Sequence, residues 1–108
     1  MASDQFVVVL TTFPVDRDVE HFAKTLIEEH LAACVNVLAP MRSIYRWKGA
    51  IESAEEHQLL IKTNTDRVHD LETRIKTLHP YDVPEFLVIS VLDGSHDYLS
   101  WVAESTKP

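Results

Sequence analysis

The order of hydrophobic and polar positions predicts alternating strands and helices. Residues 6–10 form an unbroken β-branched and aromatic run, which is typical of a strand covered on both faces. From residue 19 to residue 31, apolar side chains recur at every third or fourth position, so an amphipathic helix is predicted. Asp16 and Asp18 are suitable N-terminal caps for it. The same spacing returns over residues 68–78 and predicts a second helix.

Charged residues on this second helix are spaced to form ion pairs. Asp70 precedes Arg74 by four residues, and Glu72 precedes Lys76 by the same interval. Side chains four residues apart lie on one face of a helix, so both pairs are expected.

The middle of the chain is predicted to form a long β-hairpin. Residues 41–48 alternate in polarity, as expected for a strand with two different faces. Lys48 and Gly49 suit its tip because glycine adopts positive φ without steric cost. The return strand reaches residue 63, so both arms exceed the usual length of about five or six residues. Arms of this length overhang their own sheet and favour contact with a partner.

The remaining segments complete an α+β fold. Pro80 and Pro84 end the second helix, residues 85–92 form a last strand, and residues 97–104 form a short C-terminal helix. This order predicts a ferredoxin-like βαββαβ sandwich as a single domain over residues 1–108. Both main helices cover one face of the sheet. The other face needs the terminal helix and further copies of the chain, so an oligomer is expected.

Composition narrows the classes of function. A net charge of −7 argues against nucleic-acid binding, which needs a basic face. Cys34 is the only cysteine, so it forms no internal disulfide, and we interpret it as a small buried apolar residue. No apolar run approaches the ~20 residues that span a bilayer. Met1 to Gln5 have no signal-peptide character, so we expect a cytoplasmic protein without a membrane partner.

Catalytic motifs are not apparent. We find no glycine-rich phosphate loop, HExxH motif, serine elbow or Cys–His pair at a recognisable spacing, so the chain is not expected to be an enzyme. Glu55, Glu56 and His57 are consecutive on a predicted strand, where neighbouring side chains point to opposite faces. We interpret them as solvated residues.

The segment HPYDVPE contains the candidate metal ligands. His79, Asp82 and Glu85 lie within seven residues, and copper or zinc accepts such ligands. A trimer would bring three copies of the segment together. The alternative is a rigid connection from helix to strand, with His79 favoured by the dipole at the helix C-terminus.

A second candidate site combines aromatic and basic residues. Such side chains could line a cleft between subunits and bind a small anion. Alternatively, the aromatic residues anchor an interface and the charges form its rim. The candidates are Tyr45, Arg46, Trp47, Lys48, Lys62 and Tyr81, with Glu85 beside them.

Five segments, spread along nearly the whole chain and in the same order as in the family, resemble the CutA divalent-cation-tolerance family. They are LAACVN (31–36), SIYRWKG (43–49), LIKT (60–63), LHPYDVPE (78–85) and YLSW (98–101). The resemblance implies a ferredoxin-like protomer in a homotrimer similar to PII-type signalling proteins, with the long hairpins reaching neighbouring subunits. It also implies a role in divalent-cation tolerance, with copper(II) or another divalent cation bound but not required for folding.

The family's copper ligands map onto three positions of this chain. The resemblance places them at Thr11, Leu78 and His79, and only His79 matches the bacterial pattern of one cysteine and two histidines. Threonine and leucine supply neither a thiolate nor an imidazole. Two other hypotheses therefore stay open: a PII-like sensor of a small anion, and a trimeric scaffold for an unidentified protein partner.

Overall fold

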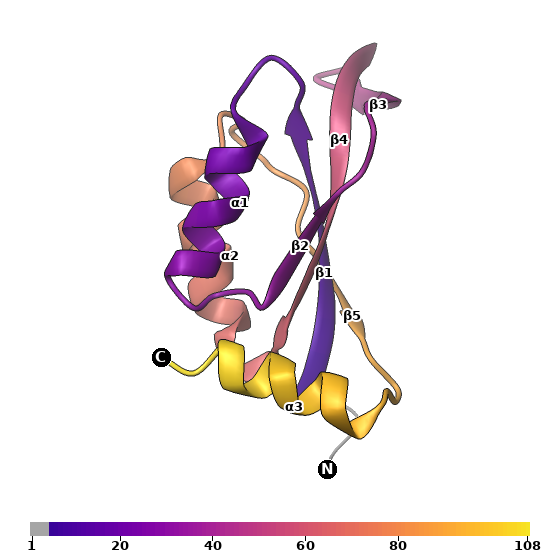
Figure 1. Ribbon diagram of the computed structural model, residues 1–108. Helices are drawn as coiled ribbons and strands as arrows, with labels where there is room; N and C mark the ends of the chain where they lie inside the picture. Colours follow the sequence, from indigo (N-terminus) through magenta and orange to yellow (C-terminus); the bar gives the residue numbers. More distant parts are fainter. Residues whose placement is uncertain (1–4) are drawn as a thin grey trace.

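The computed structural model describes residues 5–108, so residues 1–4, which contributed to the expected location, lie outside the described part. Strands and helices follow in the predicted order (Figure 1). They are β1 (Phe6–Pro14), α1 (Val19–Glu28), β2 (Cys34–Val37), β3 (Met41–Trp47), β4 (Ala50–Asn64), the 3₁₀ turn η2 (Thr65–Arg67), α2 (Val68–Leu78), β5 (Leu87–Ser90) and α3 (His96–Ser105).

One antiparallel sheet organises the molecule. Its strand order is β2-β4-β1-β5, and β3 pairs with the distal part of β4. Helices α1 and α2 lie side by side over one face of the sheet, and α3 crosses one end of it (Figure 1). This is the ferredoxin-like α+β arrangement that the sequence predicted, and that prediction is confirmed.

Strand β4 is the longest element, with 15 residues. Its C-terminal half pairs with β1 and β2, and its N-terminal half pairs with β3. Pro40 lies between β2 and β3, where it has no N–H to donate to a ladder. The hairpin of β3 and β4 therefore projects beyond the sheet, which gives the molecule extents of 45 × 26 × 24 Å.

The turn at the hairpin tip has the predicted geometry. Lys48 has a φ of 49° and Gly49 a φ of 81°, as a two-residue turn between twisted antiparallel strands requires. By contrast, α1 is shorter than predicted. It ends at Glu28, and His30 adopts a φ of 59°. Leu31 donates its N–H to the carbonyl of Leu26 and so closes the helix end.

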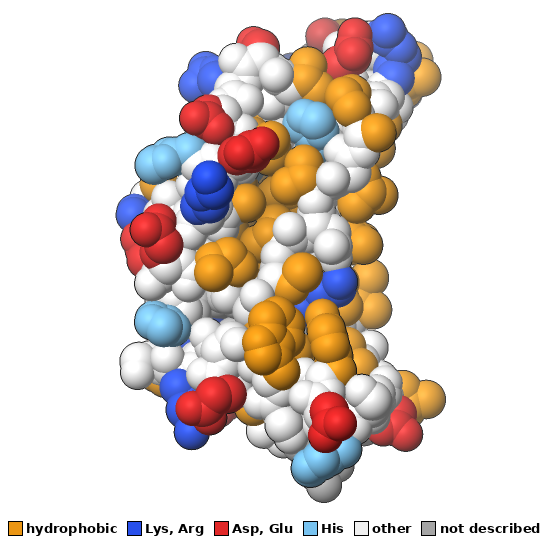
Figure 2. All heavy atoms as spheres, in the orientation of Figure 1, with side chains coloured by type: hydrophobic (Ala, Val, Ile, Leu, Met, Phe, Trp, Pro, Cys, Tyr) orange, Lys and Arg blue, Asp and Glu red, His pale blue; other side chains and the backbone are white. Residues whose placement is uncertain are grey.

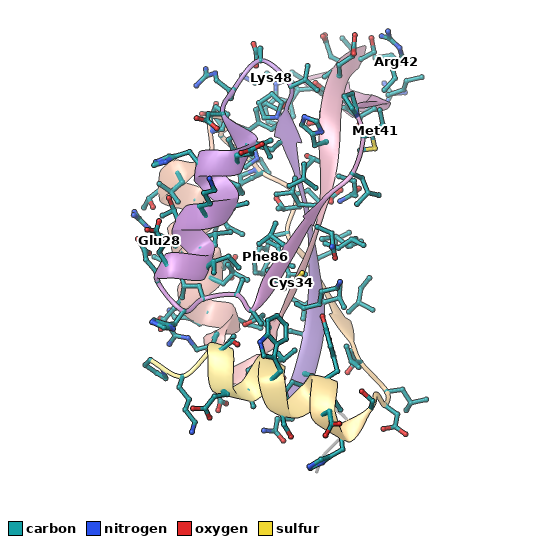
Figure 3. The ribbon with its side chains drawn as sticks, in the orientation of Figure 1. Glu28, Cys34, Met41, Arg42, Lys48 and Phe86 are labelled. Atoms are coloured by element: carbon teal, nitrogen blue, oxygen red, sulfur yellow. The ribbon has the colours of Figure 1, made fainter. Side chains whose placement is uncertain are left out.

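The core lies between the helices and the sheet. Its fully buried side chains come from both layers, and Phe86 extends into the same space from the segment before β5 (Figure 3). The residues that are 0% exposed and apolar are Val9, Leu26, Leu59, Ile61, Leu71 and Ile75. The apolar positions of the predicted amphipathic helices thus supply this core.

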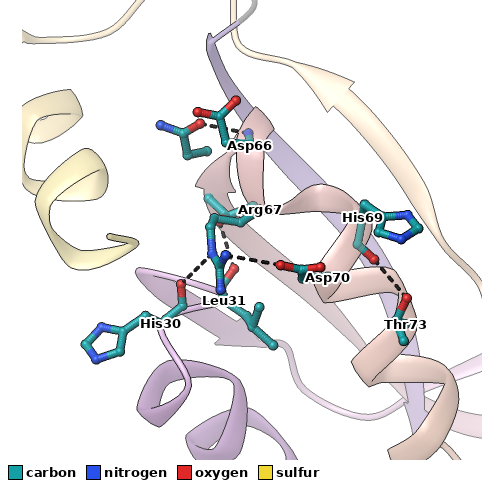
Figure 4. A network of polar contacts seen from close by, with 9 residues as sticks. His30, Leu31, Asp66, Arg67, His69, Asp70 and Thr73 are labelled. Carbon is teal, nitrogen blue, oxygen red and sulfur yellow. Dashed lines mark hydrogen bonds and ion pairs between the residues drawn. The ribbon is translucent and has the colours of Figure 1, made fainter. Parts of the chain in front are cut away.

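Two arginine side chains connect α2 and the turn before it with the end of α1, and helical spacing did not predict these contacts. Arg74 makes two contacts of 2.8 Å with the carboxylate of Glu29 at the end of α1, instead of pairing with Asp70. Asp70 contacts Arg67 at 3.2 Å, and Arg67 also donates to the carbonyl of His30 (Figure 4). The expected pair of Glu72 and Lys76 forms at 3.2 Å.

The sheet face opposite α1 and α2 is only partly covered. Helix α3 packs over its end, where Val102 contacts Phe6 in a second small core. Leu87 and Ile89 on β5 are 54% and 49% exposed, and hydrophobic side chains line this margin of the molecule (Figure 2). Among the described residues, no helix is long and apolar enough to cross a bilayer.

The burial of α1 predicts that truncating two adjacent residues of this helix lowers the free energy of unfolding by different amounts. Leu26→Ala removes a fully buried side chain and should lower the free energy of unfolding by about 2–5 kcal/mol. Ile27→Ala, at a position that is 37% exposed, should cost about 1 kcal/mol or less. Urea denaturation at one protein concentration measures both values. Equal losses would contradict the packing described for α1.

Candidate functional site

A cleft lies between the β3–β4 hairpin and the segment that follows α2. Its volume is about 620 Å³, and its walls come from β1, β3, β4 and residues 81–85. The residues that matter for its chemistry are Tyr45, Trp47, Glu56, Gln58, Tyr81, Asp82 and Glu85. Within the described part of the chain, the charged residues lining this cleft are all acidic.

Glu56 is the most constrained of these acidic residues. It is only 5% exposed, although it carries a carboxylate. One oxygen, Oε2, accepts hydrogen bonds from the Thr12 hydroxyl at 3.1 Å and the Tyr81 hydroxyl at 2.8 Å. These two donors offset part of the cost of burying the carboxylate and hold it in one orientation.

Tyr81 is held in its protonated form by the same contact. Burial raises the pKa of its hydroxyl, and the hydrogen bond to the Glu56 carboxylate raises the pKa further. The hydroxyl therefore remains a donor to Glu56 throughout the physiological range.

Gln58 organises the other side of the cleft floor. Its amide nitrogen donates to the carbonyl of Thr11 at 2.9 Å and to Oε2 of Glu85 at 2.9 Å. Glu56 and Gln58 are two residues apart on β4 and so project from the same face of the strand. Each of the two carboxylates, Glu56 and Glu85, thus has one oxygen fixed by the protein.

His79 lies behind the cleft, in the core. It is 7% exposed and packs edge-on against Phe13 and Phe22. Its Nε2 donates to the carbonyl of Thr12 at 2.6 Å, and its Nδ1 accepts the backbone N–H of Tyr81 at 3.1 Å. A carbonyl can only accept and an N–H can only donate, so these bonds select one neutral tautomer.

The charge state of His79 follows from its burial. Desolvation lowers its pKa below the ordinary value of 6.5, and the bond to Thr12 and the nearby Glu56 carboxylate oppose this effect. His79 does terminate α2 as its C-cap residue. It does so as a neutral imidazole with two internal partners, so the expected interaction of a cation with the helix dipole is weak.

The candidate metal ligands are therefore separated in one copy of the chain. Asp82 and Glu85 line the cleft, whereas both nitrogens of His79 are engaged behind it. Over residues 5–108 there is no group of three or more His, Cys, Asp or Glu side chains placed to hold a metal ion. Any metal bound here needs ligands from outside the protomer or a rearrangement of His79.

The candidate aromatic and basic residues also separate. Tyr45, Trp47 and Tyr81 line the cleft, but Arg46, Lys48 and Lys62 are not among its lining residues. The amino group of Lys48 lies 5.7 Å from the centre of the Trp47 ring. Lys62 lies on the open face of the sheet and donates to Oδ1 of Asn36.

The three positions that the resemblance assigned to copper ligands do not form a ligand set here. Thr11 is fully buried, and its hydroxyl has no hydrogen-bond partner among the described residues. Leu78 packs against the core. Cys34 is half-buried on β2 beside Lys62, not fully buried as the sequence predicted (Figure 3).

Sequence reasoning missed Thr12, Glu56 and Gln58. The interpretation of Glu56 as a solvated residue was wrong, because the side chain of Tyr81 closes over it and donates a hydrogen bond. The alternation of side chains along a strand indicated part of this burial, since Glu56 lies on the same face of β4 as Gln58 and Leu60. The burial of that face at this point depends on residues 81–85, which are distant in sequence.

Comparison with known proteins decides the family. The sequence model of the family described as CutA1 divalent ion tolerance protein matches residues 7–105 of this chain. The chain belongs to this family. The divalent-cation tolerance protein CutA of Thermus thermophilus is 44% identical over 99 residues, which is 92% of this chain and 96% of that one. The CutA structure from Xylella fastidiosa has a TM-score of 0.91 at 39% identity and covers 95% of this chain and 99% of its own.

The comparisons also correct the expected location. The family member from Archaeoglobus fulgidus is described as a periplasmic divalent cation tolerance protein. It is 31% identical to this chain, covers 94% of it and 99% of its own length, and has a TM-score of 0.89. The cytoplasmic location expected from the composition of Met1 to Gln5 is therefore wrong. A short N-terminal pattern is weak evidence of compartment.

The buried neutral His79 predicts how stability depends on pH. Because its folded pKa lies below its unfolded value of 6.5, the folded state binds fewer protons near that pH, and stability falls as pH decreases below 6.5. His79→Gln should make this loss shallower, whereas His69→Gln at an exposed position of α2 should leave it unchanged. Urea denaturation between pH 5 and 8 measures the profiles. Identical slopes in all three proteins would contradict this assignment.

Proposed function

We propose that this protein acts in divalent-cation tolerance as a homotrimer that binds copper(II) or another divalent cation, and not as an enzyme. The observation that carries this proposal is the charge of the cleft. Glu56, Asp82 and Glu85 line it without a lysine or arginine among the described lining residues. A cleft of this charge attracts cations and disfavours anions.

The proposed metal ligands are Asp82 and Glu85. Asp82 is exposed, and Glu85 is half-buried with one oxygen held by Gln58. Carboxylates coordinate divalent metals, but two of them do not complete a coordination shell. Side chains of a neighbouring subunit supply the remaining ligands. His79 joins the set only if it gives up its bonds to Thr12 and Tyr81.

Exposed apolar side chains support the homotrimer. Leu87 and Ile89 lie on the uncovered sheet face, and Ile44 and Ile51 on the projecting hairpin are 71% and 72% exposed. Contact between copies would bury these side chains and bring the hairpin of one subunit to the cleft of another.

The same apolar hairpin favours a second candidate function. A PII-like trimer could act as a scaffold or sensor that binds a protein partner at the intersubunit cleft. The charge of the cleft disfavours a small anion, because Arg46, Lys48 and Lys62 do not line this cleft in the protomer.

Calorimetric titration of chelator-treated protein with copper(II) tests the metal site. Wild type should bind at a whole-number stoichiometry per subunit, and Glu85→Gln and Asp82→Asn should each weaken binding about tenfold or more because each removes one charged ligand. His79→Gln reports whether the imidazole takes part. Light scattering on the same samples should give three times the subunit mass of 12.3 kDa.

Asp97→Asn is the matched control, since Asp97 lies on α3 at the opposite end of the molecule. It should leave copper affinity unchanged. Weak, non-stoichiometric binding that is equal in all variants would exclude the metal site, and a monomeric mass would exclude the trimer. A wild-type trimer that binds no metal would favour the scaffold over metal binding as the function.

A further inference from the structure

We propose that the cleft is a binding site for a small organic cation, whose ammonium or guanidinium group is held by the carboxylate of Glu56 and enclosed by Tyr45, Trp47 and Tyr81. This inference goes beyond metal tolerance and does not depend on it. It rests on the free oxygen of Glu56, on the aromatic walls and on the absence of a converging set of metal ligands within residues 5–108.

The first argument is the free oxygen of Glu56. Both hydrogen bonds to this side chain go to Oε2, and Oε1 has no partner among the described residues. Glu56 as a whole is only 5% exposed, and it lines the cleft. Oε1 is not among the buried atoms that lack a partner, so it is accessible from the cleft, and a cationic N–H group of a ligand can donate a charge-assisted hydrogen bond to it.

The second argument is the aromatic surface beside this oxygen. The rings of Tyr45, Trp47 and Tyr81 line the same cleft as Glu56. Aromatic faces attract ammonium and guanidinium groups through their quadrupoles, most strongly when water is excluded. Trp47 already attracts one cation, the amino group of Lys48 at 5.7 Å, and Lys48 itself is outside the cleft.

The third argument separates an organic cation from a bare metal ion. A metal ion requires ligand atoms within about 2–2.6 Å of one point. Within residues 5–108 no three acidic, histidine or cysteine side chains converge in this way. An organic cation spreads its charge and its N–H donors over several ångströms. It can therefore contact Glu56 and reach Glu85, whose orientation is fixed by Gln58.

The size of the cleft fits the same class of ligand. Its volume of about 620 Å³ lies within the range of about 300–1,000 Å³ that is typical of small-molecule sites. Glu56, Gln58, Tyr81 and Glu85 are held by hydrogen bonds before a ligand arrives, which reduces the entropy lost on binding. A short diamine or a guanidinoalkylamine matches the acidic lining of the cleft and is small enough for its volume.

Isothermal titration calorimetry with two probes, agmatine and putrescine, tests the proposal on the full-length protein. Agmatine presents a guanidinium group and putrescine only ammonium groups, so their relative affinities identify the preferred cation. 1,4-Butanediol is the neutral control of the same chain length as putrescine. Saturable binding of at least one cationic probe, with none of the diol, is the expected result.

Two pairs of variants locate the bound cation. Glu56→Gln should weaken binding about tenfold or more, since it removes the charge while its amide oxygen still accepts from Thr12 and Tyr81. Glu55→Gln, on the opposite face of β4, should change the affinity by less than about twofold. Trp47→Leu should weaken binding about three- to tenfold, and Trp101→Leu on α3 should not.

Several results would overturn the proposal. These are no saturation by either probe at millimolar concentration, equal binding of the diol, or equal effects within each pair of variants. Thermal unfolding of every variant identifies a protein that has lost its fold, and Trp47→Leu, at a position 40% exposed, keeps the test valid if Glu56→Gln unfolds. Copper titration of the same proteins separates the two proposals. If Trp47→Leu weakens binding of the organic cation but not of copper(II), the aromatic cation site is distinct from the metal site.

Discussion

The antiparallel pairing of β4 is the constraint on which the rest of the structure depends. This strand pairs with β1 along nine residues of β1 and also with β2 and β3 in succession. Its inner half presents Leu59 and Ile61 to the helices, and its outer half carries the projecting hairpin. Glu56 lies where these halves meet. The length of one strand thus creates both the core and the cleft.

At this junction the protein buries polar groups and satisfies most of them internally. Thr12 connects two of them, because its hydroxyl donates to Glu56 and its carbonyl accepts from His79. Tyr81 connects the same two, through its hydroxyl and its backbone N–H. His79 therefore supports the segment that closes the cleft. The remaining oxygen of Glu56 and the acidic rim leave a cleft suited to positive charge.

Local patterns predicted most of the fold and only part of the site. Helical periodicity identified α1 and α2, and Lys48 with Gly49 identified the hairpin turn, because both signals arise from neighbouring residues. Spacing could not show that Arg74 contacts Glu29 instead of Asp70. That choice depends on the packing of α1 against α2, where a bidentate partner across the interface competes with one on the same helix.

The sequence by itself determined the order of elements, the ferredoxin-like fold and membership of the CutA family, since these follow from periodicity and from motifs distributed along the chain. Only the tertiary structure decided which polar residues are buried and what they contact. Glu56 and Tyr81 are 25 residues apart, and His79 and Thr12 are 67 apart. The solvation and charge of a side chain depend on such distant partners, and the pattern of neighbouring residues does not identify them.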